Sequence, residues 1–443
     1  MHPMLIATSA FALLSSSLSA STFDNEAGHY RLTALPDAVD EAKRMDRMQL
    51  CDQQPAGRHV RKNEWITTHV SALPSGFTLD ALIGFRPMWG SQQDQQEEQL
   101  DAGETRFRAN QDGPLYFKLT APAGPDALGA QVTIRVDGGR PLPLYVDGAM
   151  SSKDWAGELA AHADAPFVQL VGEKALITLP AQVHDDDPIA DPRATFAAIN
   201  EVLDLENELA GFDGSSRLNE PTPLRVHYLV DFRVSERDRE TFYMYATDQF
   251  IGMLADNTTD LTDPEKLRRE WGIWHETGHT QQQNSWTWNA LGEVNVNLFS
   301  LYVQEAFGEP NALAKSEDGE PSYFDKAREY LANGATDLLL DVDGNDDGDG
   351  FFIRLVMFYQ LKEVYGWDLY KDLSKHFRAH PLAEDASDQA KADALVLALC
   401  ELTALDLRPF FARWGLRASA AASRQLDAEG YQLPDQDFSD IFN

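Results

Sequence analysis

The period of the apolar residues changes along the chain, and each change predicts a different kind of element. Residues 37–50 place apolar positions about one helical turn apart among charged ones, which predicts a helix. From about residue 60, apolar and polar residues alternate in short runs separated by Gly, Pro and Asp turns. Such runs predict strands over 64–73, 114–121, 130–139, 141–148 and 174–180. We therefore expect a β-sandwich-like domain over residues 60–182.

Helical spacing dominates the second half of the chain. An acidic, proline-containing stretch at 183–192 is typical of a domain boundary. The later runs predict helices over 194–212, 263–283, 290–307, 351–378 and 391–416, and strands over 225–232 and 240–246. The expected fold class is α+β, with a mostly helical domain and a small sheet over 183–423. Residues 21–59 are expected to lead into the sandwich, and the acidic tail 424–443 to add little.

The N-terminus is typical of a secretory signal peptide. Residues 1–20 contain no Asp, Glu, Lys or Arg, and a mainly apolar run over 5–14 is followed by small residues. This run is too short to span a membrane, and no other stretch has the roughly 18 apolar residues that a spanning helix needs. We expect a secreted, periplasmic or cell-surface protein without stable membrane insertion.

The acidic composition narrows the set of partners. The chain carries 71 Asp and Glu against 37 Lys and Arg, a formal net charge of −34. Nucleic acid and anionic membrane surfaces are therefore poor partners through bulk charge. The two cysteines, Cys51 and Cys400, are too few for a thiolate zinc site. Export would permit a disulfide between them, and two buried thiols are equally compatible with the sequence.

The strongest chemical signal is the run His275-Glu276-Thr277-Gly278-His279, an HExxH motif. Residues four apart lie on one face of a helix, so the two imidazoles can reach the same Zn²⁺ ion. Glu293, in the next predicted helix, is the best candidate for the third ligand. Three protein ligands leave one coordination position open for water, which is typical of a catalytic site. Glu276 would then act as the general base on that water.

The surroundings of the motif support this interpretation. Thr262 and Glu265, with Pro264 between them, form the pattern of a capping box at the start of the predicted helix. Asn297, one turn beyond Glu293, is placed to hydrogen-bond a ligand from outside the coordination shell. Five residues at helical spacing form one stripe along the predicted helix: Leu267, Trp271, His275, Gly278 and His279. Because this stripe contains both candidate ligands and apolar residues, we expect the face that carries the ligands to point toward the core.

These residues carry a resemblance to a known family. WGIWHETGHTQQ (271–282) followed by GEVNVNLFSLY (292–302) resembles the M60-like, enhancin-related metallopeptidases, which are gluzincins. The family pattern is HExGH, a nearby glutamine and a later glutamate, matched here by Gln282 and Glu293. Thr280 stands where the family often has asparagine, a position that is not a ligand. Weaker similarity extends from about residue 60 to about residue 420.

The resemblance implies a secreted zinc-dependent endopeptidase that cleaves O-glycosylated, mucin-type glycoproteins. In gluzincin-like folds a strand ahead of the zinc helix pairs with extended substrate, and we assign that edge to the segment around Tyr243 and Tyr245. Tyr302 is one candidate for the group that stabilises the oxyanion.

Two alternatives stay open at this point. A glycan-binding adhesin with a vestigial metal site would need sugar-stacking aromatic residues. Tyr116, Phe117 and Tyr145 lie on predicted strands and are expected in the core, whereas Trp89 lies in loop-like sequence. An aminopeptidase would need an anchor for the substrate N-terminus such as a GxMEN-like strand, which the sequence lacks.

A calcium loop is the other metal site that the sequence suggests. Asp343, Asn345, Asp347 and Gly348 match the first half of an EF-hand loop. The bidentate glutamate is replaced by Arg354, so the segment Asp343–Gly348 favours a solvated acidic turn over a Ca²⁺ site.

Overall fold

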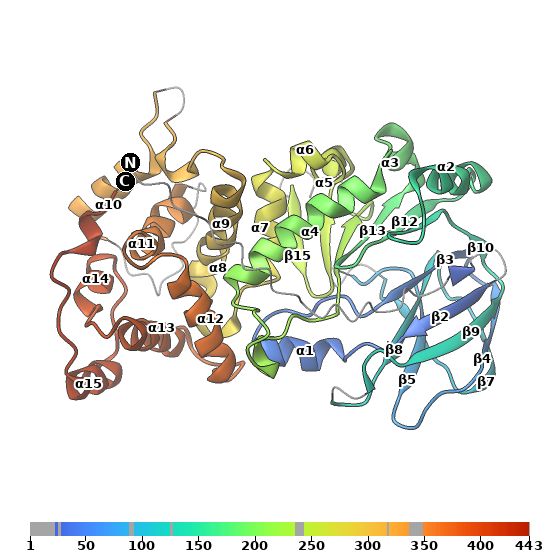
Figure 1. The fold of residues 1–443 in the computed structure, drawn as a ribbon, viewed down its shortest axis with the longest axis horizontal. Coiled ribbons are helices and arrows are strands. Elements are labelled where there is room, and N and C mark those ends of the chain that lie inside the picture. Colours follow the sequence, from blue (N-terminus) through green and yellow to red (C-terminus); the bar gives the residue numbers. More distant parts are fainter. Residues whose placement is uncertain are drawn as a thin grey trace, which may run out of the picture.

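The computed structural model describes residues 23–24, 28–87, 93–124, 127–234, 243–316, 319–335 and 349–442. A β-sandwich lies at one end, a six-stranded sheet with helices lies in the middle, and a group of helices lies at the other end (Figure 1). This arrangement confirms the predicted α+β class. The predicted signal peptide, Trp89 and the predicted turn at Asp343–Gly348 lie outside the described residues.

The sandwich consists of two five-stranded sheets in which neighbouring strands pair antiparallel. The first sheet contains β1 (Phe23–Asp24), β2 (His29–Thr33), β9 (Gln131–Asp137), β4 (Trp65–Val70) and β7 (Gly103–Arg108). The second contains β10 (Arg140–Pro141), β3 (Gln54–Val60), β8 (Gly113–Thr120), β5 (Thr78–Ile83) and β6 (Gln96–Gln99). Because β2 and most of β3 precede residue 60, the sandwich begins within the predicted lead-in segment.

The six-stranded sheet is larger than predicted. Its order is β11 (Leu144–Val146), β12 (Phe167–Val171), β13 (Ala175–Pro180), β14 (Val226–Val230), β16 (Phe250–Met253) and β15 (Met244–Thr247). The runs 141–148 and 174–180 were predicted for the sandwich, but β11 and β13 belong here. The stretch 183–192 is not a joint, because α3 (Ala181–Asp186) packs on β12 and β13. The chain changes sheets between Pro141 and Leu144 instead.

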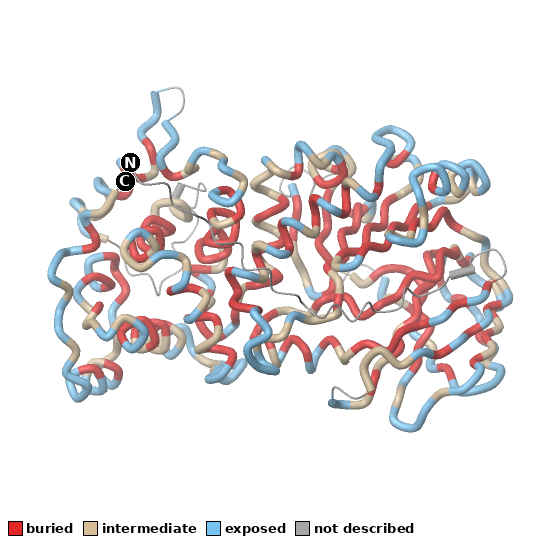
Figure 2. Tube along the Cα trace, in the orientation of Figure 1, coloured by how far each residue is buried: buried red, intermediate tan, exposed pale blue. Residues whose placement is uncertain are grey.

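Successive residues of these strands point to opposite faces of the sheet. On β14, Tyr228 and Val230 pack in the same buried cluster as helices α4 (Pro192–Leu209) and α7 (Trp271–His279). Leu229, between them, faces the opposite cluster with Phe85. The middle strands are therefore buried on both faces, as Figure 2 shows along most of their length. Tyr116, Phe117 and Tyr145 are fully buried, in agreement with the core expected for them.

The remaining helices form the other end of the molecule around one large apolar cluster. They are α8 (Gly292–Asn295), α9 (Asn297–Phe307), α10 (Tyr323–Ala332), α11 (Asp349–Tyr365), α12 (Asp368–Ala379), α13 (Asp388–Thr403), α14 (Arg408–Arg413) and α15 (Ala420–Glu429). The short helices α1 (Ala38–Met45), α2 (Ser152–Ala161), α5 (Thr258–Thr262) and α6 (Pro264–Leu267) lie nearer the sheets. Cys51 and Cys400 are separate buried thiols, so the disulfide alternative is not realised.

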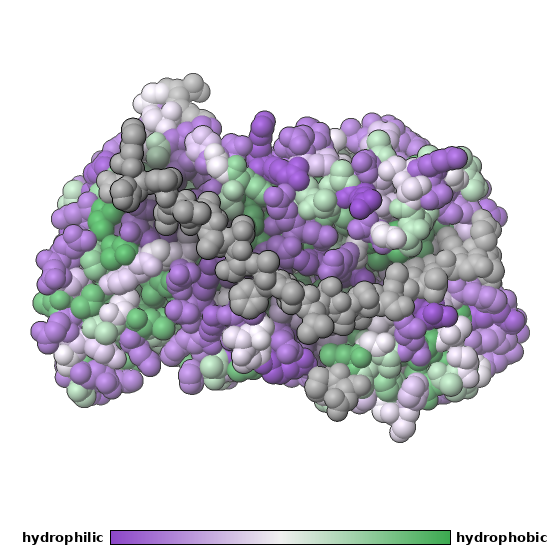
Figure 3. All heavy atoms as spheres, viewed as in Figure 1, coloured by the Kyte–Doolittle hydropathy of each residue, from purple (hydrophilic) through white to green (hydrophobic). Residues whose placement is uncertain are grey.

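The visible face of the molecule is mainly hydrophilic. Hydrophilic residues cover most of the face seen in Figure 3, with smaller hydrophobic groups between them. Among the described helices, none combines the length and the apolar character that a membrane span requires.

The C-terminal tail contributes more than the sequence predicted. Phe438 is 4% exposed and contacts Phe410 and Tyr365, with ring centroids 6.4 and 5.8 Å away. The buried Gln360 amide donates to the carbonyl oxygens of Ser439 and Ile441, at 3.0 and 2.9 Å. The acidic composition of the tail therefore does not predict whether it packs, because the buried Phe438 anchors the segment.

We predict that Phe438→Ala lowers the free energy of unfolding by about 3–5 kcal/mol, because it leaves a cavity in the helical core. Urea unfolding followed by circular dichroism measures this value. Leu433→Ala is the matched control, since Leu433 is 60% exposed and should change stability by less than about 0.5 kcal/mol. Equal effects of the two substitutions would contradict the packed position of the tail.

Candidate metal centre

Helix α7 carries the HExxH motif, and its start differs from the prediction. The predicted helix 263–283 is two helices, α6 and α7, separated at Glu270, whose backbone is extended with φ −95° and ψ 98°. Asp263 caps α6 through its side chain, and Glu270 caps α7 by accepting from the Gly272 N–H. Thr262 is no cap, because its hydroxyl donates to the Thr258 carbonyl oxygen.

The buried face of α7 is the one opposite the ligands. Ile273, Trp274, Thr277 and Gly278 are buried, whereas both histidines are only half-buried. The predicted stripe is therefore only partly right: Leu267 and Gly278 are buried, whereas the two histidines keep contact with solvent. The Thr277 hydroxyl is 2.8 Å from the Tyr228 hydroxyl, which ties α7 to β14.

Close packing of α7 on α9 brings the third candidate ligand into place. A Cβ atom at Gly278 would stand 3.1 Å from the Phe299 Cβ and 3.2 Å from the Val296 carbonyl oxygen. The predicted helix 290–307 is divided into α8 and α9, and Glu293 lies in the first turn of α8. The absence of a side chain at Gly278 thus lets the two segments approach.

The structure brings His275, His279 and Glu293 together. The Nε2 atoms of His275 and His279 are 3.2 Å apart, and Glu293 Oε2 lies 3.0 and 3.5 Å from them. The Glu293 side chain is 47% exposed, against 18% and 14% for the histidines. The cluster is therefore open to solvent on the glutamate side.

Side-chain amides fix the orientation of both imidazole rings. Asn297 Oδ1 lies 2.8 Å from His275 Nδ1, and Gln282 Oε1 lies 2.6 Å from His279 Nδ1. Because an amide oxygen only accepts, both Nδ1 atoms must carry the proton. The Nε2 lone pairs of the neutral rings then point at Glu293.

The amides are themselves held in place. Trp271 Nε1 donates to Asn297 Oδ1 at 3.1 Å, and Asn297 Nδ2 donates to the Glu293 carbonyl oxygen at 2.8 Å. Gln282 Nε2 donates to the Gly292 carbonyl oxygen and to Asn295 Oδ1. Asn297 was identified from its spacing. The contacts of Gln282, Trp271 and Asn295 were missed, and Gln282 could have been found as the glutamine that follows the motif.

The donor set fits a tetrahedral zinc ion. Atoms at about 2.0–2.1 Å from one such ion stand roughly 3.3 Å apart, close to the separations within this cluster. Two neutral imidazoles and one carboxylate are also the ligand types that zinc takes in catalytic sites. Within the described part of the chain, it is the one group of three or more such ligands whose atoms all lie within 4.8 Å.

The charges of the cluster favour a cation. Burial acts to raise the pKa of Glu293, but the contacts of its carboxylate with the His275 and His279 rings, when these carry a proton on Nε2, outweigh burial and hold that pKa well below its usual range. Burial acts to lower the pKa of His279, and the hydrogen bond and charge of Glu293 outweigh this effect and raise it. The Glu293 carboxylate therefore stays ionised next to the two rings.

The Glu276 side chain lies on the side of α7 that faces β15, the edge strand of the sheet. Burial raises the pKa of its carboxyl above the usual range, although the nearby His279 and His275 oppose the rise. The backbone N–H of Ala246, on β15, lies close enough to this carboxylate to oppose the rise in its pKa. The candidate base thus lies beside the strand that precedes the motif, a contact that sequence spacing does not reveal.

The three tyrosines predicted to bind substrate lie in different surroundings. The Tyr243 side chain is 45% exposed, and its hydroxyl donates to Asp260. Tyr245 is buried, with its hydroxyl 2.5 Å from Asp231 Oδ2, so its side chain faces the core.

Tyr302 is not brought to the cluster. Burial and the nearby Glu208 raise the pKa of its hydroxyl to about 12, and its ring contacts Lys371 and Trp367.

The chain is similar in sequence to several known proteins. The sequence pattern of the family described as peptidase M60, enhancin and enhancin-like matches residues 138–415, which is more than half of the chain. An immunomodulating metalloprotease of Pseudomonas aeruginosa is 26% identical over 426 residues, covering 79% of this chain and 44% of that protein. A TRPM8 channel-associated factor homolog of Xenopus laevis is 24% identical over 299 residues, covering 67% and 30%. The chain spans less than half the length of these curated relatives.

Solved structures share the fold. A mutant of a functionally unknown conserved protein from Bacillus anthracis has a TM-score of 0.77 at 26% identity, with 93% of this chain and 80% of that chain covered. The M60 catalytic domain of Clostridium perfringens ZmpC, in complex with the sialyl T antigen, has a TM-score of 0.71 at 19% identity, covering 93% and 81%. A metallopeptidase in complex with the Tn antigen has a TM-score of 0.76 at 16% identity, covering 94% and 80%. The chain therefore belongs to the peptidase M60, enhancin and enhancin-like family of metallopeptidases.

Proposed function

We propose that the chain is a zinc-dependent endopeptidase that hydrolyses peptide bonds of O-glycosylated, mucin-type glycoproteins. His275, His279 and Glu293 would hold the zinc ion, and Glu276 would act as the general base. The observation that carries the proposal is the convergence of two oriented Nε2 atoms and one carboxylate oxygen beside a second, separately held carboxylate. When bound, zinc polarises the scissile carbonyl and makes its water ligand more acidic.

Glu276 has the surroundings of a base that acts next to a metal. Its burial favours the uptake of a proton, because the neutral form of a carboxyl is easier to bury. The Ala246 N–H, on the β15 side of the helix, favours the charged form of the same carboxylate. The residue is thereby positioned to take a proton from water and to pass it to the leaving amine.

The strand β15 is suited to bind the substrate backbone. It is the last strand of the sheet, and in the described part of the chain no further strand pairs with its outer side. Alternate residues of an antiparallel strand direct their N–H and C=O groups to the same side. Because the Ala246 N–H reaches Glu276, the backbone groups of Met244 and Ala246 lie on the outer edge, beside the cluster. An extended peptide could pair there by β-augmentation.

The substrate class rests on the relatives. Two structures of the same fold are complexes with the sialyl T antigen and the Tn antigen, which are O-linked glycans. We therefore propose glycoprotein substrates for this chain. We also propose export, on the basis of the signal-peptide pattern of residues 1–20. The adhesin alternative does not require an oriented donor set or a held base, and the tests below separate it from an enzyme.

Glu276→Gln is expected to retain one zinc ion per chain and to lose cleavage by at least about 100-fold, because the amide cannot accept the proton. His275→Ala is expected to lose both zinc and activity, since it removes a ligand. Metal analysis and digestion of a mucin-type glycoprotein measure the two properties. Cleavage by Glu276→Gln at the wild-type rate would refute its role as the base.

Cleavage is expected to require both metal and glycan. Mass spectrometry should find internal fragments of the glycoprotein, no fragments after chelation, and few after enzymatic removal of the O-glycans. Stepwise release of N-terminal amino acids would indicate an aminopeptidase instead. Binding of the glycoprotein without any cleavage by the zinc-loaded chain would favour the adhesin.

Asn297→Leu is expected to weaken zinc binding by about 10- to 100-fold, because His275 loses the acceptor that fixes its ring. Competition with a chromogenic chelator measures the affinity. Asn333→Leu, at the C-terminal end of α10, is the control for the same substitution away from the cluster. Unchanged zinc affinity in Asn297→Leu would contradict the orienting role of the amide.

A further inference from the structure

The segment that connects α7 to α8 is held by a part of the chain far away in sequence. We define residues 280–285 as the connecting segment; it follows His279 and contains Gln282, which orients that histidine. Its contacts come from the C-terminal end of α1, at Asp46 and Arg47. These two residues lie well before residue 138, where the match to the M60 family begins.

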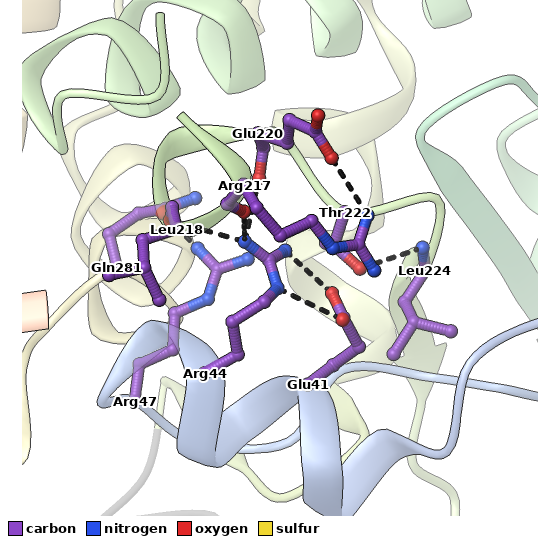
Figure 4. Close-up of polar contacts among 9 residues, drawn as sticks. All are labelled: Glu41, Arg44, Arg47, Arg217, Leu218, Glu220, Thr222, Leu224 and Gln281. Atoms are coloured by element: carbon purple, nitrogen blue, oxygen red, sulfur yellow. Dashed lines mark hydrogen bonds and ion pairs between the residues drawn. The ribbon is translucent and has the colours of Figure 1, made fainter. Parts of the chain in front are cut away.

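Arg47 contacts the connecting segment from a buried position. The Arg47 side chain is 3% exposed, and its Nη1 donates to Gln281 Oε1 (Figure 4). Gln281 Nε2 in turn lies 3.4 Å from Asn207 Oδ1 on α4. The Arg47 guanidinium also lies over the Phe212 ring, 5.1 Å from its centroid. Gln281 is thus held between α1 and α4, directly before the residue that bonds His279.

Asp46 holds the other end of the same segment. Its carbonyl oxygen accepts from the Asn284 N–H at 2.8 Å, and its Oδ2 accepts from the Ser285 N–H at 3.1 Å. Asp46 has φ 57° and ψ 40°, the left-handed conformation that ends α1 and turns the chain toward these groups. The two neighbouring residues therefore fix both ends of the connecting segment through directional hydrogen bonds.

We propose that Asp46 and Arg47 are positioning residues for the metal centre, acting through the connecting segment on Gln282 and thereby on the His279 ring. This inference rests on the proposed function, since it assumes that the cluster binds zinc. A glutamine side chain can orient an imidazole only if its own backbone is fixed. Arg47 and Asp46 supply that restraint on the two sides of Gln282, at Gln281 and at Asn284 and Ser285.

Arg44, in the last turn of α1, provides a matched control close to Arg47 in the sequence. Its Nη1 donates to three backbone carbonyl oxygens, those of Arg217, Leu218 and Glu220, and its guanidinium pairs with Glu41 (Figure 4). Like Arg47, it therefore ties α1 to another part of the chain. The segment that Arg44 holds contains no residue of the metal centre. An Arg44 variant therefore measures the loss of a general contact of the fold without a direct effect on the cluster.

The test uses the full chain with Arg47→Met, the double substitution Arg47→Met with Gln281→Met, and Arg44→Met. Zinc affinity is measured by chelator competition, and the visible absorption of the Co²⁺-loaded protein reports the ligand geometry. Thermal unfolding of each protein controls for stability. The double substitution replaces both partners of the hydrogen bond by apolar side chains, which leaves neither partner unpaired if Arg47→Met alone does not fold.

We expect Arg47→Met and the double variant to weaken zinc binding about tenfold and to alter the Co²⁺ spectrum. Arg44→Met should keep both within twofold of the parent, even where its unfolding temperature falls. Wild-type affinity and spectrum in a folded Arg47→Met or double variant would overturn the inference, as would an equal loss in Arg44→Met. A parent chain that binds no zinc would instead overturn the proposed function itself.

Discussion

The proposed metal centre depends on one constraint: two imidazole rings must present their Nε2 lone pairs to the same point. An imidazole does this only if its Nδ1 proton has an acceptor in a fixed place. Asn297 and Gln282 are those acceptors, at 2.8 and 2.6 Å. The nitrogen of each amide donates to a backbone carbonyl oxygen: Asn297 to that of Glu293, and Gln282 to that of Gly292. The same two side chains therefore orient the histidines and hold the segment that carries the third ligand.

The rest of the fold serves to fix the elements that carry these groups. Gly278 lets α7 and α9 approach, and the Tyr228–Thr277 hydrogen bond anchors α7 to the sheet. The edge strand β15 reaches Glu276 through a backbone N–H, so the position of the candidate base depends on the sheet rather than on α7 alone. On the far side, the end of α1 meets the segment that follows His279. Sheet, helices and N-terminal segment thus converge on one short helix.

Features that depend on local residue spacing could be predicted from the sequence. Features that depend on contacts between distant segments could not. The pairs His275–His279 and Glu293–Asn297 are each one helical turn apart, so their common faces follow from helix geometry. Strand periods located β8, β9 and β13, but a period of two cannot say to which sheet a strand belongs. The predicted orientation of α7 was not fully met, because the sheet buries one face of the helix while the cluster lies on the other. The contacts of Ala246 and Arg47 join residues far apart in sequence and leave no local pattern.

X-ray absorption spectroscopy of the zinc-loaded chain tests the central claim most directly, because it reports the ligands of the ion. The account predicts one zinc ion per chain, with two imidazole nitrogens and only oxygen atoms besides, all at about 2.0–2.2 Å. A spectrum with fewer than two imidazoles, or with a sulfur ligand at about 2.3 Å, would contradict a centre built from His275, His279 and Glu293.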